Sequence, residues 1–140
     1  YKEKTVFFVT KGRAFPYKSI KDLGDKLIGV KLGWSYGKAF DKAKADKLFT
    51  TTVGSANQIF RLLNAGKLDM VVDNELSGRR VVNDLNVKEN IEVLAKPLLQ
   101  GDIYIALKKG SNAVLIEKFN LHLKRIKSNG TFKKILAKYY

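Results

Sequence analysis

The segment LLNAGKLDMVVDNELSGR, residues 62–79, decides the fold class of this 140-residue chain. Its first part closes a helix at Gly66, a residue type that commonly ends helices, and a short apolar run, LDMVVD at residues 68–73, follows. Such a run between turn residues is typical of a buried strand, and the pattern that resumes over residues 75–85 predicts another helix. A helix, a strand and a helix in succession indicate an α/β fold.

The same alternation of strands and helices extends through most of the chain. The predicted strands cover residues 5–10, 27–32, 49–53, 68–73, 91–94 and 102–108. The predicted helices cover residues 37–45, 55–66, 75–85, 113–128 and 131–140, and a single turn with a capping-box pattern covers residues 19–22. Strands that alternate with helices usually lie parallel, so we expect a mostly parallel sheet with helices on both faces. The last two helices close the chain without returning to the sheet.

The composition excludes several classes of chemistry. The chain has no cysteine, which removes disulfides and thiolate metal sites, and its single histidine, His122, disfavours an imidazole metal site or a Ser-His-Asp arrangement. Ser35 and Asp73 follow predicted strands, but the sequence places no His or Lys partner beside either of them. We therefore expect no catalytic residues, no metal and no cofactor.

The chain carries a formal net charge of +14, which raises the question of a polyanionic partner. Its lysines occur in every segment, and no block of five or six consecutive cations is present. This distribution favours a solvated basic surface, so we expect no nucleic-acid partner. A basic polyanion-binding domain stays open as an alternative, and a steep salt dependence of binding to random DNA would support it.

Three stretches carry a resemblance to a known family. They are SIKDLGDKLIGVKLGWSYG at residues 19–37, LLNAGKLDMVVDNELSGR at residues 62–79, and IYIALKKGSNAVLIEKFNLHLKRIKSNGTFKKILAKYY at residues 103–140. In this order and spacing, they resemble the bilobed periplasmic solute-binding proteins of polar amino-acid ABC importers, the family 3 extracellular solute-binding proteins. The resemblance covers the whole chain and implies a periplasmic-binding-protein-like fold.

The resemblance also implies a domain organisation. Residues 1–11 would form the outgoing hinge strand, residues 12–100 the α/β body of lobe two, residues 101–110 the returning hinge strand, and residues 111–140 the C-terminal helices of lobe one. The first part of lobe one would then be missing, so we expect a C-terminal fragment of an exported, periplasmic protein from which the signal peptide has been removed.

The loop GWSYG at residues 33–37 lies where a predicted strand ends and a helix begins. Unpaired N–H groups and the helix dipole at such a point attract an anion. In the family, this loop binds the ligand α-carboxylate through backbone N–H groups, including that of Gly37, and through a hydroxyl that Ser35 matches. Ser35 could instead be the N-cap of its helix. Trp34 and Tyr36 could stack on a ligand, or they could pack the loop against its own lobe.

Asp73 ends an apolar strand at the carboxyl edge of the sheet, where open α/β folds bind their ligands. It matches the acidic residue with which the family pairs the ligand's α-ammonium, and a buried carboxylate without a cation would carry a desolvation cost. The alternative is a helix N-cap for the residues from Asn74 onward. We expect Asp73 and Ser35 to face one cleft.

The resemblance, together with the absence of a catalytic arrangement, implies non-enzymatic capture of a small amino-acid-like ligand that is passed to an ABC permease in the inner membrane. An extracellular sensory ligand-binding module is the alternative. In the family, the apolar positions of the last two helices face a lobe-one core; they are Leu115, Phe119, Ile126, Phe132, Ile135 and Leu136. Because that core would be largely missing, we also expect possible self-association through residues 113–140.

Overall fold

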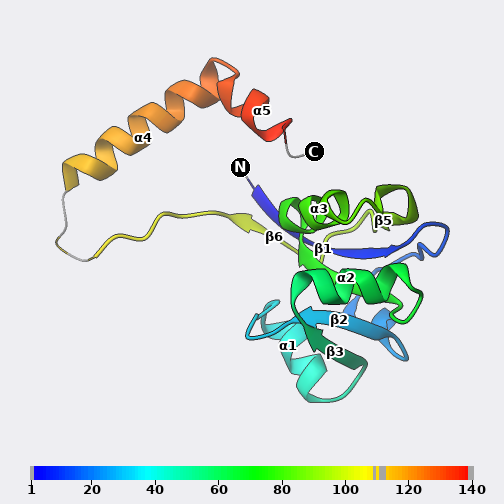
Figure 1. Cartoon of the computed structure of the whole chain (residues 1–140). Helices are drawn as coiled ribbons and strands as arrows, with labels where there is room; N and C mark the ends of the chain where they lie inside the picture. Colours follow the sequence, from blue (N-terminus) through cyan, green and yellow to red (C-terminus); the bar gives the residue numbers. More distant parts are fainter. Residues whose placement is uncertain (1, 109, 111–112, 139–140) are drawn as a thin grey trace. The chain divides into compact units, whose positions relative to one another are not determined.

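The computed structural model of the chain describes residues 2–108, 110 and 113–138 (Figure 1). It divides into two compact units, Tyr1–Asp102 and Ile103–Tyr140, and each is described by itself. The first unit holds the strands β1 (Lys2–Thr10), β2 (Leu27–Lys31), β3 (Thr50–Gly54), β4 (Met70–Asn74), β5 (Ile91–Val93) and β6 (Leu99–Asp102). Its helices are α1 (Lys38–Ala45), α2 (Ala56–Asn64) and α3 (Glu75–Asp84), with 3-10 turns at Ile20–Leu23 and Lys88–Asn90.

All strands of the first unit belong to one sheet with the order β3-β2-β4-β1-β5, and β6 pairs with another part of β1. β2 lies parallel to β3 and β4, whereas β1 lies antiparallel to β4, β5 and β6. Every strand except β1 therefore points the same way, which confirms the mostly parallel sheet and the α/β class. β1 is the exception, and it lies between β4 on one side and β5 and β6 on the other.

Two hydrophobic clusters cover the two faces of this sheet. Phe7 and Val9 of β1 pack into the cluster that contains Phe40 of α1. The alternate side chains of β1 point to the other face, where Phe8 packs edge-on against Phe60 of α2 with ring centroids 5.0 Å apart. Because residues 6–9 of β1 are buried on both faces of the sheet, this part of its sequence is a continuous apolar run and does not alternate.

The predicted strand over residues 102–108 is wrong for most of its length. The regular strand is β6, and its ladder with β1 ends where Asp102 pairs with Lys2. Residues 103–108 form no regular strand, because the described part of β1 offers them no further backbone partner. Residue 109 of the predicted returning hinge lies outside the described residues.

The second unit contains α4 (Ala113–Ser128) and α5 (Thr131–Leu136), which confirms the predicted pair of closing helices. Gly130 separates them with a left-handed φ of 80°, a conformation that glycine adopts without a steric cost. α5 ends at Leu136, and residues 111, 112, 139 and 140 of the predicted C-terminal segment lie outside the described part. None of the described residues of these two helices is buried.

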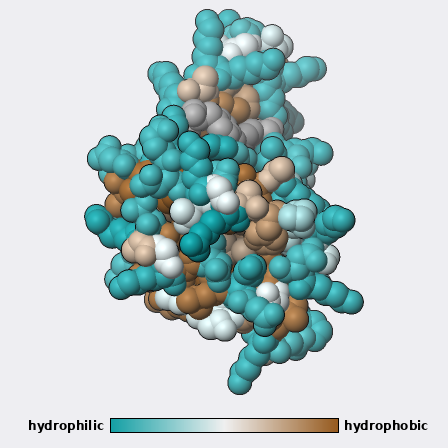
Figure 2. All heavy atoms as spheres, turned by 90° about the vertical axis from the view of Figure 1, so that its right-hand side faces the viewer, coloured by the Kyte–Doolittle hydropathy of each residue, from teal (hydrophilic) through white to brown (hydrophobic). Residues whose placement is uncertain are grey.

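On the face shown in Figure 2, hydrophilic residues predominate and hydrophobic residues are scattered among them. None of the described helices is long and apolar enough to cross a membrane.

Candidate functional site

The candidate site lies at the carboxyl ends of β2 and β4, which are parallel neighbours. Their register pairs Ile28 with Met70 and Gly29 with Val71, so the two strands reach the same edge of the sheet together. β2 continues into the loop 33–37 and α1, and β4 continues into α3. Adjacent parallel strands thus bring the two segments predicted to bind a ligand to one edge, as open α/β sheets do.

Asp73 is completely buried at this edge and is bound by a cation of the same chain. Its Oδ1 lies 2.5 Å from Nζ of Lys31 and accepts a hydrogen bond from the Asn74 N–H at 2.7 Å. Its Oδ2 is buried and has no hydrogen-bond partner among the described residues. Burial raises the pKa of Asp73, and this effect outweighs the opposing influence of Lys31 and of the Asn74 N–H.

Asp73 does not cap α3. Asn74 is the N-cap residue, and its Oδ1 accepts a hydrogen bond from the Ser77 N–H at 3.0 Å. The Asn74 side chain also donates a hydrogen bond to Glu3 of β1. Asp73 is therefore not the N-cap residue of α3, and helix capping does not account for the burial of its carboxylate.

Lys31 is the site residue that sequence reasoning missed, and the expectation that no Lys partner lies beside Asp73 was wrong. The lysine ends β2, its side chain is only 12% exposed, and its Nζ lies 3.4 Å from the ring centroid of Trp34. Trp34 is 54% exposed, so one face of its ring covers the ammonium while the rest meets solvent. A single charge at the end of the apolar run LIGVKL was the signal in the sequence.

The loop before α1 is organised by a second residue that sequence reasoning missed, Asp41. The Ser35 hydroxyl donates to Oδ2 of Asp41 at 2.5 Å, and the Tyr36 N–H donates to its Oδ1 at 3.1 Å. The Gly37 N–H donates to the Ser35 hydroxyl at 3.4 Å. Gly37, and not Ser35, is the N-cap residue of α1, so Ser35 has no capping role. The signal for Asp41 in the sequence was the position of this acid in the first turn of a predicted helix.

Tyr36 belongs to the hydrophobic core of the first unit. The residue is 3% exposed, its ring lies edge-on to Phe40 at 5.5 Å, and its hydroxyl accepts a hydrogen bond from the Lys31 N–H at 2.8 Å. Burial, with a smaller contribution from the negative charges of Asp73 and Asp41, raises the pKa of Tyr36 to about 12. Its buried side chain anchors the loop to the hydrophobic core, whereas Trp34 is the aromatic residue of the loop that faces solvent.

The structure thus joins Trp34 and Asp73 through Lys31, and it joins Ser35, Tyr36 and Gly37 through Asp41. The site contains a carboxylate with one oxygen that has no partner among the described residues, and it contains hydroxyl and N–H donors at the start of α1 whose hydrogen bonds Asp41 and Ser35 accept. These are partners for an ammonium and for an anion. Among the described residues, no group of three His, Asp or Glu side chains is placed to hold a metal ion.

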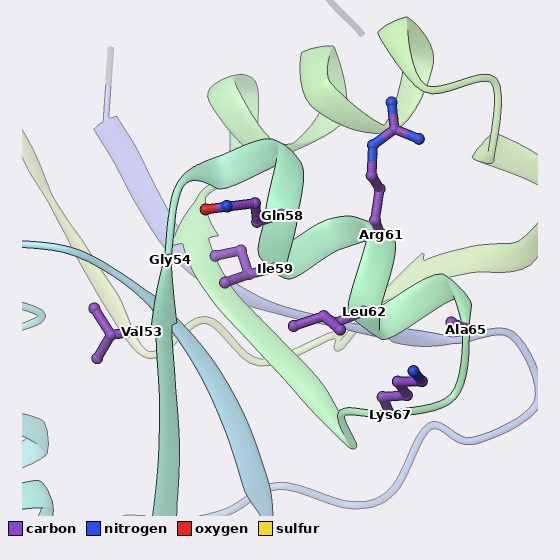
Figure 3. Close-up of a pocket in the computed structure, with 8 residues that line it drawn as sticks. All are labelled: Val53, Gly54, Gln58, Ile59, Arg61, Leu62, Ala65 and Lys67. Atoms are coloured by element: carbon purple, nitrogen blue, oxygen red, sulfur yellow. The ribbon is translucent and has the colours of Figure 1, made fainter.

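A separate hollow lies beside the edge strand β3, between it and α2, with a volume of about 540 Å³ (Figure 3). Its polar side chains do not converge. Gln58 reaches back toward the start of α2, where its Oε1 accepts the Ser55 N–H, and Arg61 points away from Val53 and Lys67. A hollow without convergent polar groups lacks what a specific small-molecule site needs, so the strand ends at Asp73 remain the candidate.

The stability of the chain should depend on pH through Asp73. Its pKa in the folded state is raised above the unfolded value of about 3.9, so between these two values the folded chain binds more protons. Stability relative to Asp73→Asn should therefore fall as pH rises through this window, and recover as pH falls. Urea unfolding of both proteins between pH 3 and pH 7 measures the difference.

Asp22 provides the control with the opposite sign. The N–H groups of Lys18 and Ser19 lower the pKa of this exposed carboxyl, so the stability it contributes is present above its unfolded pKa and is lost as pH falls. Asp22→Asn should remove this loss of stability at low pH. If the difference in stability from the wild type changed with pH in the same way for both variants, Asp73 would not be buried as described.

Solved structures provide the comparison with known proteins. The second substrate-binding domain of a putative amino acid ABC transporter from Streptococcus pneumoniae matches 99% of this chain with a TM-score of 0.71 and 28% identity. An ancestral arginine-binding protein bound to arginine matches 100% of it with a TM-score of 0.70 and 28% identity. Substrate-binding domain 2 of GlnP from Lactococcus lactis, in its open conformation, matches 99% with a TM-score of 0.67 and 29% identity.

The resemblance seen in the sequence is therefore confirmed: the structural neighbours include a substrate-binding domain of a putative amino acid ABC transporter and an arginine-binding protein. The chain spans 59 to 61% of the length of these three relatives. A histidine kinase sensor domain with similarity to periplasmic binding proteins, 18% identical with a TM-score of 0.67, shares the fold. No protein-family model and no curated protein matches the chain.

Proposed function

We propose that this chain provides one wall of the binding site in a protein that captures a small amino acid, without converting it, for uptake by an ABC importer. The observation that carries the proposal is the buried carboxylate of Asp73, one oxygen of which has no partner within the described part of the chain, beside a loop of hydroxyl and N–H donors. The relatives support this class of ligand, because their names include proteins bound to arginine, glutamine, glutamate and lysine.

In this proposal, Asp73 binds the ligand ammonium through Oδ2. The ligand carboxylate binds the Ser35 hydroxyl and the N–H groups of the loop, including that of Gly37, where the dipole of α1 favours an anion. Trp34 offers its exposed ring to the ligand side chain. Tyr36 acts indirectly, by fixing the loop against Phe40. Charge and hydrogen-bond complementarity for a zwitterion then come from two adjacent strand ends.

The wider organisation follows from the resemblance to the relatives. We infer that β1 is the outgoing hinge strand, that residues 12–100 are lobe two, that residues 101–110 return through the hinge, and that residues 111–140 belong to lobe one. Closure of two lobes around the ligand would create the form that a permease in the inner membrane recognises, and the site of action would be the periplasm. A sensory module is the second candidate, because a histidine kinase sensor domain shares the fold.

The second unit supports a further interaction. A hollow of about 390 Å³ is lined mainly by apolar side chains of the segment 103–107 and of α4, among them Leu115 and Phe119. We infer that a second copy of the chain covers this face, because an exposed apolar patch of this kind is rarely left open in a stable monomer.

The test of ligand capture uses the 140-residue chain itself. Titrations with L-arginine, L-glutamine, L-lysine and L-glutamate are followed by NMR, with the indole of Trp34, the only tryptophan, as reporter. Asp73→Asn should weaken binding at least about thirtyfold, because it removes the charged partner of the ligand ammonium, a loss of ~2 kcal/mol or more. Asp84→Asn is the matched control, since Asp84 is an exposed acid of the same unit that pairs with Arg80. Equal affinities of the Asp73 variant and the wild type would overturn the proposal.

A further inference from the structure

The carboxylate of the candidate site is already bound by an ammonium group of the chain. Nζ of Lys31 lies 2.5 Å from Oδ1 of Asp73, between the buried carboxylate and the ring of Trp34. An amino-acid ammonium and a lysine ammonium present the same charge and the same donors. Both would therefore compete for Asp73.

The donors of the loop are likewise bound by a carboxylate of the chain. Asp41 accepts hydrogen bonds from the Ser35 hydroxyl and from the Tyr36 N–H, one on each of its oxygens. This two-oxygen arrangement has the chemistry of a ligand α-carboxylate on the same loop. A ligand carboxylate that binds there must displace Asp41.

The two contacts are parts of one site because Tyr36 joins them. Its backbone N–H binds Asp41, and its hydroxyl accepts the N–H of Lys31. The side chain that links them is buried and packs against Phe40, so the core holds the backbone of Lys31 and the loop next to each other. The chain thereby presents an ammonium and a carboxylate to two adjacent parts of its own site.

We propose that Lys31 and Asp41 are built-in stand-ins for the two charged ends of an amino acid, and that a ligand binds by exchange with them. This inference rests on the proposed function. Two ammonium groups beside one buried carboxylate repel each other, so Lys31 has to leave when a ligand ammonium arrives. The affinity of the site is then lowered by the fraction of molecules in which the stand-ins are in place.

Asp73 shows why the exchange favours a ligand over the lysine. Lys31 engages Oδ1 and leaves the fully buried Oδ2 without a partner among the described residues. A free ammonium group is not tethered to β2 and can place its donors on both oxygens. A buried acceptor that gains its missing hydrogen bond recovers part of its desolvation cost.

The experiment compares Lys31→Met and Asp41→Asn with the wild type, using the same four amino acids as probes. Each variant removes one stand-in and should bind about tenfold more tightly, because the competition is relieved. Lys42→Met and Asp46→Asn are the matched controls. They change the same residue types in an exposed ion pair of α1 and its C-cap, with Nζ and Oδ2 2.6 Å apart. The controls should leave affinity unchanged.

Trp34 gives a readout that does not depend on binding. In the ligand-free chain, Lys31→Met should shift the Trp34 indole resonance and its fluorescence, because the ammonium leaves the ring, whereas Lys42→Met should not. Ligand addition to the wild type should shift the same signals in the same direction. Thermal unfolding checks that each variant is folded, and the Asp41 variant tests the exchange independently if Lys31→Met destabilises the chain.

The outcomes separate the two claims. If the wild type binds amino acids but the Lys31 and Asp41 variants bind equally or more weakly, the stand-in role is wrong while the proposed function stands. If the wild type and both folded variants show no saturable binding, the proposed function fails, and the exchange fails with it.

Discussion

Replacing Gly78 by alanine is expected to destabilise the first unit by about 3 kcal/mol, because the new methyl group overpacks the core. Gly78 lies buried in α3, and a Cβ at this position would fall inside the van der Waals envelope of the Phe8 ring and 3.2 Å from Cζ of Phe60. Both rings are buried and pack against each other, so neither can move aside. In an exposed helix, the same change would stabilise the chain by up to about 1 kcal/mol.

Urea unfolding followed by circular dichroism measures this loss. Gly101→Ala in β6 is the matched control, because nothing lies within 4 Å of a Cβ there, and its stability should stay near that of the wild type. Combining Gly78→Ala with Phe8→Leu should recover part of the loss, since the smaller side chain makes room. A Gly78→Ala protein as stable as the wild type would mean that α3 does not pack on β1 as closely as described.

The 140-residue chain is expected to self-associate, and Phe119→Lys is expected to weaken that association at least about thirtyfold, the effect of losing a central interface residue worth ~2 kcal/mol. Phe119 lines the apolar hollow of the second unit, and 42% of it is exposed. Sedimentation velocity over a range of protein concentrations measures the change. Added salt should strengthen association of the wild type, because the segment 103–140 carries nine Lys and Arg residues against one acid, Glu117.

His122→Lys is the control for this prediction. His122 lies on the exposed surface of α4 and is not among the residues that line the hollow, so the variant adds a cation without removing apolar surface. Its association should stay close to that of the wild type at high salt. A wild-type chain that sediments as a monomer at every concentration would show that no second copy covers this face.

Most of the elements could be predicted from the sequence because their signals are local. The apolar run before Asp73 becomes β4, and Ser55 with Gln58 starts α2 through a reciprocal capping box, with Ser55 N–H to Oε1 at 2.9 Å. Local signals failed at residues 103–108, where the composition suits a strand. A strand also needs a partner, and the described part of β1 ends opposite Asp102.

What the sequence by itself determined is therefore the α/β class, the succession of helices and strands, and the two segments that meet at one sheet edge. Only the tertiary structure decided that β1 runs against its neighbours, that Tyr36 is part of the core, and that Lys31 and Asp41 occupy the candidate site. The physical reason is distance along the chain. Lys31 and Asp73 meet because β2 and β4 pair in one particular register, and no local pattern of either strand specifies that register.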